Sequence, residues 1–539
     1  MAYDYVIVGG GSAGCVMAAR LSEDPTVSVC LLEAGGDGKD LIIRAPAMAA
    51  TMISGRPKIN NWAFQTEPQP ELNGRRGYQP RGRTLGGSSA INAMLYVRGD
   101  PGDYDEWADL GCDGWDWQGV LPYFQKSEHN QRGNDGLHGG DGPLQVANQS
   151  EPRPITRAFV EAAAQVQIRE TQDFNGEEQE GAGLYQVTQF HDGPKRGERC
   201  SAAAAYLHPV LNRANLTVIT RATAHRIRFD GTRATGVEYA RRGQVCVAEA
   251  KREVILSAGS FGSPQLLLLS GVGPRDELAA HRIEPVVESP GVGRNLQDHL
   301  DYIIGYRSNR RDVLGLNPRG LYDLARAGLR WRKDGGGLFA SPIAEGGAFF
   351  KSDPGVARPD LQLHFVAGIV DDHLRKIHLH HGFSCHVCVL RPESRGHVGL
   401  LSTDPMAAPR IDPGFLSDRR DLDLLMTGAK RLEALLTAPP LDPWRGKRLY
   451  PHDGSDAAIE ADIRARADTI YHPVGTCKMG RDHMAVVDSH ARLHGCDGLR
   501  VVDASVMPRL IGGNTNAPTI MIAEKIADRM NAEISRAAA

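Results

Sequence analysis

The segment that ends at Glu33 restricts the fold of this 539-residue chain more than any other. An apolar run at 5–8 leads into a Gly-x-Gly-x-x-Gly turn at 9–14, which predicts a buried strand, a tight turn and a helix. A second apolar run at 27–32 ends at Glu33, at the spacing of about 20 residues that dinucleotide-binding units show. This order predicts a βαβ unit that binds a dinucleotide.

The residues of the turn fit a bound pyrophosphate. Gly9 permits the tight turn, Gly11 lets the backbone approach the pyrophosphate, and Gly14 lets the helix pack closely on the strand. The anion would lie at the helix N-terminus, beside Ser12 and Ala13, where free N–H groups and the positive end of the helix dipole face it. A glycine-rich turn without a ligand is the alternative, and the complete unit around it favours binding.

Glu33, followed by Ala34, closes the predicted unit. A carboxylate at this place accepts hydrogen bonds from a ribose hydroxyl group. It would repel a 2′-phosphate, so NADP is not the expected ligand. An NAD-dependent enzyme and a non-catalytic nucleotide-binding module stay open at this point.

Length and composition narrow the class of protein. A chain of 539 residues is longer than one hydrophobic core usually spans, so we expect two or more domains. The net charge of -3 gives no electrostatic reason to expect nucleic acid as a partner. Nine scattered cysteines indicate free thiols in a reducing compartment. With its first strand at residue 5 and no apolar run that spans a bilayer, the chain is expected to be cytoplasmic, and peripheral membrane contact is left open.

Further predicted elements are separated by polar and irregular sequence. Apolar runs at 216–219 and 254–256 predict buried strands, and Ser263 with Pro264 predicts the cap and first turn of a helix. After about residue 305 the sequence becomes irregular and rich in Arg and His. We interpret the chain as a nucleotide-binding domain built from separated segments, with a second domain inserted between them.

Long motifs outside the first unit carry a family resemblance. They lie at 82–92, 259–273, 471–476, 503–505 and 514–516. Together they resemble the signatures of the glucose-methanol-choline (GMC) oxidoreductases. The sequence His-Pro-Val-Gly-Thr-Cys-Lys-Met-Gly that starts at His472 is most similar to that of bacterial choline and alcohol dehydrogenases of the family.

The resemblance implies a flavoprotein that binds FAD and oxidises an alcohol. The implied fold mixes α/β and α+β architecture. A Rossmann-like FAD-binding domain is interleaved with a substrate-binding domain built on an antiparallel sheet that helices cover. We expect the FAD-binding domain to comprise 1–148, 199–305 and 468–539. The substrate-binding domain is then expected to comprise 149–198 and 306–467.

The loop at 82–92 is expected to lie along the pyrophosphate and the flavin. Gly86 and Gly87 leave the backbone free to lie against a cofactor, while Ser88 and Asn92 supply short hydrogen-bonding groups. Some members of the family attach FAD through a histidine in this loop. Ile91 stands at that position, so we expect FAD to be bound non-covalently.

The resemblance implies further cofactor contacts outside this loop and the first βαβ unit. For Asp503 the alternative is a turn or cap residue. The other expected contacts are Arg83, Ala224, Ala504, Asn514, Thr515 and Asn516.

Alcohol oxidation needs a hydride acceptor, which the flavin supplies, and a base for the hydroxyl proton. His472 precedes Pro473 in a glycine-bounded loop and occupies the family's histidine motif, so we expect it to be the base. Asn516 matches the second member of the family's histidine and asparagine pair and is expected to hold the alcohol oxygen beside His472. A helix from Thr519, after Pro518, is expected to present its N-terminus to the reduced flavin.

Two other features suggest additional sites. Cys385 and Cys388 lie in a His-rich region, but a strand at 383–390 would turn them to opposite faces, so we expect no metal. Glu345 matches a position that faces the cationic group of the substrate in choline-oxidising relatives. One carboxylate does not make a choline site, because a quaternary ammonium group also favours an aromatic cage.

The expected reaction is oxidation of a small-molecule alcohol, preferably a primary one, to its aldehyde, with electrons passed to a quinone-type acceptor. The motif around His472 resembles the dehydrogenases of the family more closely than the oxidases. An alcohol or choline oxidase that uses oxygen is one alternative. A lyase similar to hydroxynitrile lyases, in which FAD is structural, is the other.

Overall fold

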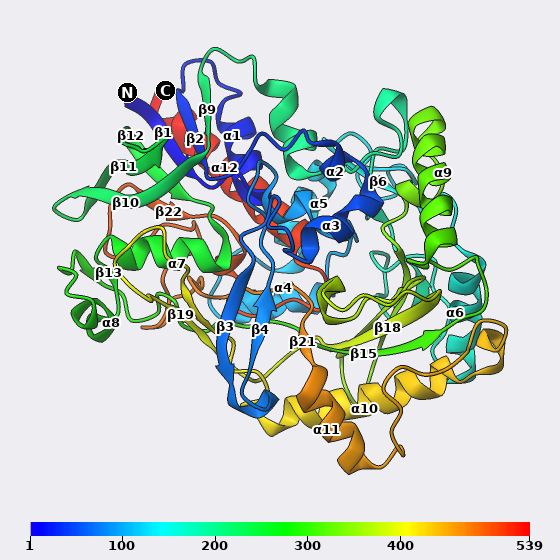
Figure 1. The fold of residues 1–539 in the computed structure, drawn as a ribbon. Helices are drawn as coiled ribbons and strands as arrows, with labels where there is room; N and C mark the ends of the chain where they lie inside the picture. Colours follow the sequence, from blue (N-terminus) through cyan, green and yellow to red (C-terminus); the bar gives the residue numbers. More distant parts are fainter. Residues whose placement is uncertain (1, 539) are drawn as a thin grey trace.

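The computed structural model describes residues 2–538. A seven-stranded sheet lies close to both ends of the chain (Figure 1). β1 pairs in parallel with β2 and β12, as in a dinucleotide-binding fold. The strand order is β10-β11-β12-β1-β2-β9, and β22 also pairs with β12. The bounds are β1 (Ala2–Val8), β2 (Val29–Glu33), β9 (Leu216–Thr220), β10 (Ala222–Asp230), β11 (Arg233–Arg241), β12 (Gln244–Leu256) and β22 (Leu499–Val501).

The first βαβ unit has the predicted form. Helix α1 (Ser12–Leu21) follows β1 directly, and β2 ends at Glu33. Gly9 has a φ of +97°, which L side chains rarely adopt. A Cβ atom on Gly14 would overlap the carbonyl oxygen of Gly9, so only glycine lets α1 pack this closely on β1. The predicted strands, helix and tight packing are confirmed.

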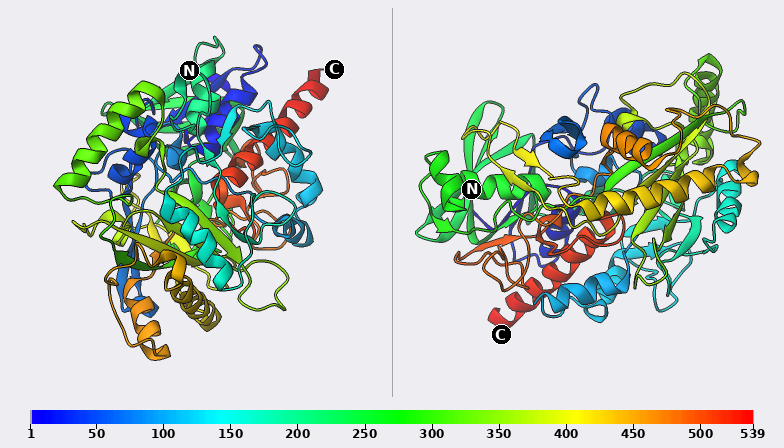
Figure 2. Two further views of the ribbon diagram at one scale, coloured as in Figure 1. Left: turned by 90° about the vertical axis from the view of Figure 1, so that its right-hand side faces the viewer. Right: turned by 90° about the horizontal axis from the view of Figure 1, so that it is seen from below.

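A second, six-stranded sheet is antiparallel throughout, in the order β21-β15-β18-β17-β16-β7. Helices α6 (Pro154–Gln165) and α10 (Arg419–Leu436) pack against it, and Figure 2 shows α10 lying along one side of the sheet. The predicted antiparallel sheet covered by helices is thereby confirmed. The bounds are β7 (Gly181–Leu184), β15 (Leu300–Arg307), β16 (Ala344–Phe350), β17 (Leu361–Val366), β18 (Gly382–Val389) and β21 (Asp468–Thr469).

Shorter elements complete the fold. The remaining strands are β3 (Phe64–Gln69), β4 (Arg75–Gln79), β5 (Glu128–Asn130), β6 (Leu144–Ala147), β8 (Val187–Thr188), β13 (Val272–Gly273), β14 (Val287–Glu288), β19 (His397–Gly399) and β20 (Arg410–Asp412). The remaining α-helices are α2 (Leu41–Arg44), α3 (Ala49–Ile53), α4 (Pro101–Asp109), α5 (Trp117–Ser127), α7 (Gly259–Leu269), α8 (Arg275–Ala280), α9 (Pro318–Asp334), α11 (Asp456–Arg466) and α12 (Asn516–Ala538). No helix within 2–538 is both long and apolar enough to span a bilayer.

The strand at 383–390 is confirmed as β18. Cys385 packs in the core cluster that includes α10, whereas Cys388 packs in a different cluster with Leu390 and Phe349. The two thiols therefore diverge, as the strand geometry predicted. Across the described residues, no group of three potential metal ligands comes together.

Two domain boundaries differ from the prediction. β15 runs continuously from Leu300 to Arg307 within the second sheet, so the boundary expected at 305 divides a strand. β21 at Asp468–Thr469 pairs with β15, although we assigned it to the FAD-binding domain. Because β15 is almost entirely buried and has no polar break near residue 305, the sequence gives no signal for a boundary there.

Two helices begin earlier than predicted. α7 starts at Gly259, so Pro264 lies inside it and Ser263 is not its cap. Because Pro264 has no N–H, the carbonyl oxygen of Ser260 is free to accept a hydrogen bond from the Thr476 hydroxyl at 2.7 Å. α12 starts at Asn516, with Pro518 in its first turn, where proline is tolerated.

Candidate active site

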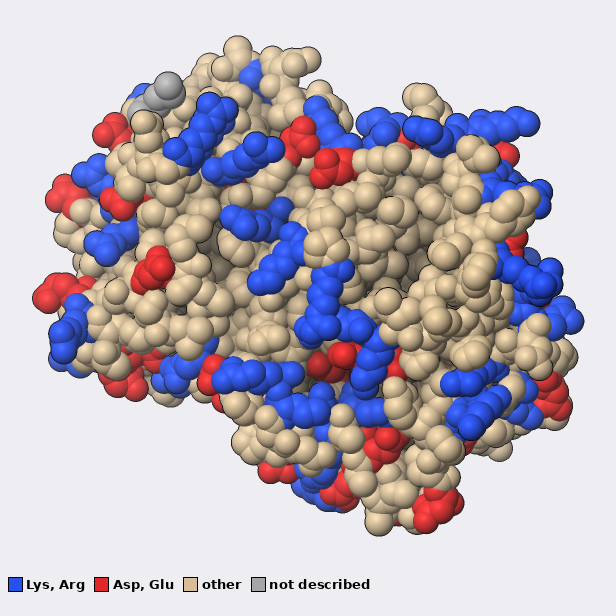
Figure 3. All heavy atoms as spheres, in the orientation of Figure 1, with Lys and Arg blue, Asp and Glu red and all other residues tan. Residues whose placement is uncertain are grey.

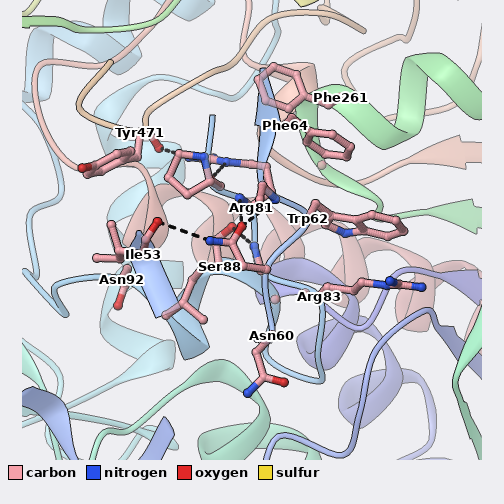
Figure 4. Close-up of a pocket in the computed structure, with 18 of the residues that line it drawn as sticks. Ile53, Asn60, Trp62, Phe64, Arg81, Arg83, Ser88, Asn92, Phe261 and Tyr471 are labelled. Carbon is pink, nitrogen blue, oxygen red and sulfur yellow. Dashed lines mark hydrogen bonds between the residues drawn. The ribbon is translucent and has the colours of Figure 1, made fainter. Parts of the chain in front are cut away.

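A cavity of about 1520 Å³ is lined by residues of both sheets. β1 and β10 contribute Val8 and Ala224, while β17 and β18 contribute His364 and His386. In Figure 3, Lys and Arg side chains cross the hollowed central part of the visible face. Figure 4 shows an aromatic wall, in which the rings of Trp62 and Phe64 stack with centroids 5.6 Å apart.

Most of the expected cofactor contacts line this one cavity. They are Gly9, Gly11, Ser12, Ala13, Glu33, Ala34, Arg83, Gly87, Ser88, Asn92, Ala224, Asp503, Ala504, Asn514, Thr515 and Asn516. Gly14 and Gly86 do not line the cavity. They instead shape the backbone of the two glycine-rich loops beside it. Gly86 has a φ of +91°, and its N–H donates to the carbonyl oxygen of Gly10 at 2.7 Å. This contact ties the 82–92 loop to the first glycine turn.

The two glycine loops face each other across a narrow gap. A Cβ atom on Gly87 would lie 2.6 Å from the Cα atom of Gly11. The gap therefore offers bare backbone, which suits a phosphate group. Elsewhere in the cavity lining, the guanidinium group of Arg83 lies over the Trp62 ring, 4.5 Å from its centroid, and the buried Nε has no hydrogen-bond partner among the described residues.

The Glu33 carboxylate is buried and held by backbone groups. Oε2 accepts from the N–H of Gly10 at 2.9 Å, and Oε1 accepts from the N–H of Gly35 at 2.7 Å. Burial raises the pKa of Glu33 to about 7. Each oxygen can accept a second hydrogen bond, so a ribose hydroxyl can bind here.

Asp503 acts structurally as a cap residue, the alternative considered above. Its Oδ2 accepts from the N–H of Gly259 at 2.8 Å and from the Ser263 hydroxyl at 2.6 Å. Its Oδ1 accepts from the N–H of Ser505 at 2.8 Å. Asp503 also lines the cavity, and it joins the start of α7 to the 3₁₀ turn at Ala504–Val506.

His472 is buried and has three polar contacts. Its Nδ1 lies 2.9 Å from Nδ1 of His299, and its Nε2 lies 3.1 Å from Nδ2 of Asn514. Its backbone N–H donates to Oδ1 of Asp298 at 2.9 Å. Burial, followed by the neighbouring His299, holds the pKa of His472 well below its ordinary value of 6.5. The ring is therefore uncharged at neutral pH.

The hydrogen bonds fix which nitrogen of His472 carries the proton. Nε2 of His299 donates to the carbonyl oxygen of Leu390 at 3.0 Å, because a carbonyl oxygen can only accept. Nδ1 of an uncharged His299 must then accept, and Nδ1 of His472 must donate. A lone pair remains on Nε2 of His472, the atom that faces Asn514.

Asn514 is oriented from its other side by Gln362. Nε2 of Gln362 donates to Oδ1 of Asn514 at 3.1 Å and to the Tyr185 hydroxyl at 2.9 Å. The Tyr185 hydroxyl in turn donates to the carbonyl oxygen of Leu363 at 2.8 Å. This arrangement turns the Asn514 amide so that its NH₂ group faces His472.

The expected placement of Asn516 beside His472 is wrong. Oδ1 of Asn516 accepts from the Ser12 hydroxyl at 2.7 Å, at the first glycine turn. The chain enters α12 at Asn516, so the two asparagines on either side of Thr515 project to different parts of the cavity. Asn514 is the member of the motif that contacts His472.

The expected substrate contact of Glu345 is also wrong. Glu345 lies in β16 but does not line the cavity. Its Oε2 accepts from the N–H of Arg153 and the Thr156 hydroxyl, each at 2.8 Å, and its Oε1 accepts from the Ser341 hydroxyl at 2.8 Å. The carboxylate therefore satisfies the N-terminus of α6.

We predict that Glu345→Gln lowers the free energy of unfolding by about 1–3 kcal/mol, because an amide NH₂ then faces groups that need an acceptor. Alcohol preference should not change. Urea unfolding of the holoenzyme, with kinetics on choline and neutral alcohols, checks both. Selective loss of choline oxidation at unchanged stability would restore the substrate role.

Sequence reasoning missed several residues around His472. His299 comes just before β15, and His364 and His386 are register partners on β17 and β18. Burial lowers the pKa of His299 to about 4 and that of His364 to about 3. Nδ1 of His386 lies 2.6 Å from Oδ2 of Asp301. A histidine within an otherwise apolar buried strand was the available indication.

Family models of GMC oxidoreductases match residues 3–301 and 392–523. The chain belongs to the GMC oxidoreductase family. This GMC oxidoreductase is 46% identical to the alcohol dehydrogenase (acceptor) of Pseudomonas putida, over 98% of this chain and 95% of the relative. It is 44% identical to human mitochondrial choline dehydrogenase, over 98% and 89%. Pyridoxine 4-oxidase from Mesorbium loti has a similar structure, with a TM-score of 0.88 and 33% identity, covering 98% and 99% of the two chains.

As a GMC oxidoreductase, the chain is an FAD-dependent enzyme. The cavity fits this cofactor. The N-terminus of α1 and the facing glycine loops would hold the pyrophosphate, and Glu33 would hold the ribose.

Proposed function

We propose that this enzyme oxidises a small primary alcohol to the aldehyde, with His472 as the general base. The observation that carries the proposal is the contact of Nε2 of His472, which lines the cavity, with the Asn514 amide, because the tautomer deduced from the His299 contacts leaves a lone pair on this atom. FAD, when bound, supplies the acceptor for the hydride.

The side chains provide the rest of the chemistry. Nε2 of His472 takes the hydroxyl proton, and the Asn514 NH₂ group donates a hydrogen bond to the alcohol oxygen as negative charge develops on it. The hydrogen bond from Nδ1 of His472 to His299 keeps the ring in the required tautomer. Asp298 holds the backbone of the same loop.

The charges around the cavity favour neutral alcohols over choline. Seven cationic side chains line it, namely Arg56, Lys58, Arg76, Arg81, Arg83, Arg221 and Arg375. Of the carboxylates that line it, Glu33 and Asp503 accept hydrogen bonds from the protein, and Glu67 pairs with Arg76. A quaternary ammonium group would find no free carboxylate in the cavity lining to pair with.

For the acceptor, we propose a quinone-type carrier. We predict that a neutral primary alcohol is oxidised faster than choline, and that turnover is faster with a quinone or a dye than with oxygen. Steady-state assays with each acceptor, with peroxide measured in air, check this. Rapid peroxide formation would make the enzyme an oxidase, and alcohol cleavage without flavin reduction would make it a lyase.

We propose that FAD is held without a covalent bond. Ile91 packs with Ile43, Met52 and Ala90 in an apolar cluster beside the cavity, and its side chain offers no nucleophile. Acid precipitation is therefore predicted to release FAD into the supernatant. Yellow colour retained in the washed pellet would contradict this prediction.

We further propose that the enzyme works in the cytoplasm, at the inner face of a membrane. All nine cysteines are free, and most are buried, which suits a reducing compartment. A quinone acceptor dissolves in the bilayer, so the enzyme would meet it at the membrane surface.

A further inference from the structure

Helix α9 presents an apolar stripe to solvent. Tyr322 is 63% exposed and Leu329 is 70% exposed, and they lie one above the other about two turns apart. Leu321, beside them, is 54% exposed. Trp331 anchors the opposite side, where its Nε1 donates to the carbonyl oxygen of Gly197 at 2.9 Å. α9 lies at the outer edge of the molecule in both Figure 1 and Figure 2.

A row of cations runs beside this stripe. Arg319, Arg326 and Lys333 recur at every seventh residue and so share one side of α9. Within residues 2–538, none of the three lies at ion-pair distance from a carboxylate. Figure 3 shows Lys and Arg along the edge where Figure 1 places α9, although the chain as a whole has a net charge of -3.

A second exposed apolar segment adjoins the start of α9. Ile377 is 69% exposed and Leu379 is 63% exposed. His381, two residues after Leu379, forms a β-bridge with Gly315. Gly315 in turn packs closely on the start of α9, because a Cβ atom on Gly320 would overlap its carbonyl oxygen. We call Leu321, Tyr322, Leu329, Ile377, Leu379 and the three cations the α9 surface.

The α9 surface is connected along the chain to the lining of the cavity. Leu374 and Arg375, which are three and two residues before the exposed Ile377, line the cavity. The 374–379 segment therefore joins the cavity lining to exposed apolar side chains of the α9 surface.

We propose that the α9 surface binds a bilayer that contains anionic phospholipid. A helix in the plane of an interface buries an apolar stripe among the acyl chains, while flanking Lys and Arg contact the headgroup phosphates. A symmetric second copy fits less well, because the same basic row would face itself across the interface. This inference rests on the membrane location proposed above, and vesicle binding is measured without any substrate or acceptor.

Sedimentation of the FAD-loaded enzyme with vesicles tests the proposal. One set contains phosphatidylcholine alone, and the other contains phosphatidylcholine mixed with phosphatidylglycerol. We expect binding to the mixed vesicles, weakening with added salt, and little binding to phosphatidylcholine alone.

Two variants and a matched control locate the binding. Tyr322→Glu combined with Leu329→Glu should lower partitioning at least about tenfold. Replacing Arg319, Arg326 and Lys333 by Gln should lower it roughly 100-fold, at about fivefold per cation. Val245→Glu, in the 63% exposed Val245 of β12, should not change it. Dye-linked activity should stay at the wild-type level in all three.

Three results would overturn the proposal. They are absence of binding to the mixed vesicles, binding that both α9 variants retain, and loss in these variants of a dimer detected by size-exclusion chromatography. The last result would assign the α9 surface to self-association.

Discussion

Replacing His472 by alanine slows reduction of the bound flavin by an alcohol about 10²- to 10⁴-fold, the usual contribution of a positioned general base. FAD stays bound, because the contacts expected to hold it lie on other segments. The cause is loss of Nε2, whose lone pair is fixed by the hydrogen bond from Nδ1 to His299. Anaerobic stopped-flow absorbance of the flavin gives the rate constant, and the spectrum of the purified variant gives FAD content.

His483→Ala is the control for this substitution, because His483 is exposed and lies away from the cavity lining. It should reduce at the wild-type rate. A His472→Ala enzyme that holds a full complement of FAD and is reduced as fast as wild type would show that another group is the base.

The second large effect is expected at Asn514. Asn514→Ala should lower kcat/KM for the alcohol about 10²- to 10³-fold, the cost of removing one hydrogen-bond donor to a developing oxyanion. Steady-state kinetics with a saturating dye acceptor measure it. The Gln362 contact should make the loss large, since it already holds the amide in its working orientation.

Asn516→Ala is the matched control, with the same side chain two residues further along. It removes the contact with Ser12 at the cofactor end and should weaken FAD retention while changing kcat/KM of the loaded enzyme only a few-fold. If Asn516→Ala lost activity and Asn514→Ala kept it, the pairing seen in the structure would not describe the reaction.

The first βαβ unit could be predicted because its features are local. The turn at Gly9, the close packing at Gly14 and the position of Glu33 follow from a short stretch whose periodicity and glycine spacing have few structural solutions. The strand at 383–390 was predictable for the same reason. The predicted strand also placed Cys385 and Cys388 on opposite faces, as the structure shows.

The surroundings of His472 depend on pairings between distant segments. His299 lies 173 residues before His472 in the sequence. The two rings come into contact because β15, which follows His299, pairs with β21, which precedes His472. Asn514 and Asn516 have the same side chain, and the difference between them is where α12 begins. Glu345 resembles a substrate contact in sequence, yet its strand register turns it toward the N-terminus of α6.

The central claim is that this chain removes a hydride and a proton from an alcohol. Anaerobic mixing of the purified holoenzyme with primary alcohols, followed at the flavin absorbance band, tests it most directly. At least one neutral primary alcohol is expected to bleach the flavin, and the aldehyde should form in an amount equal to the FAD. A fully loaded enzyme whose flavin stays oxidised with every alcohol, or that converts an alcohol without bleaching, would contradict it.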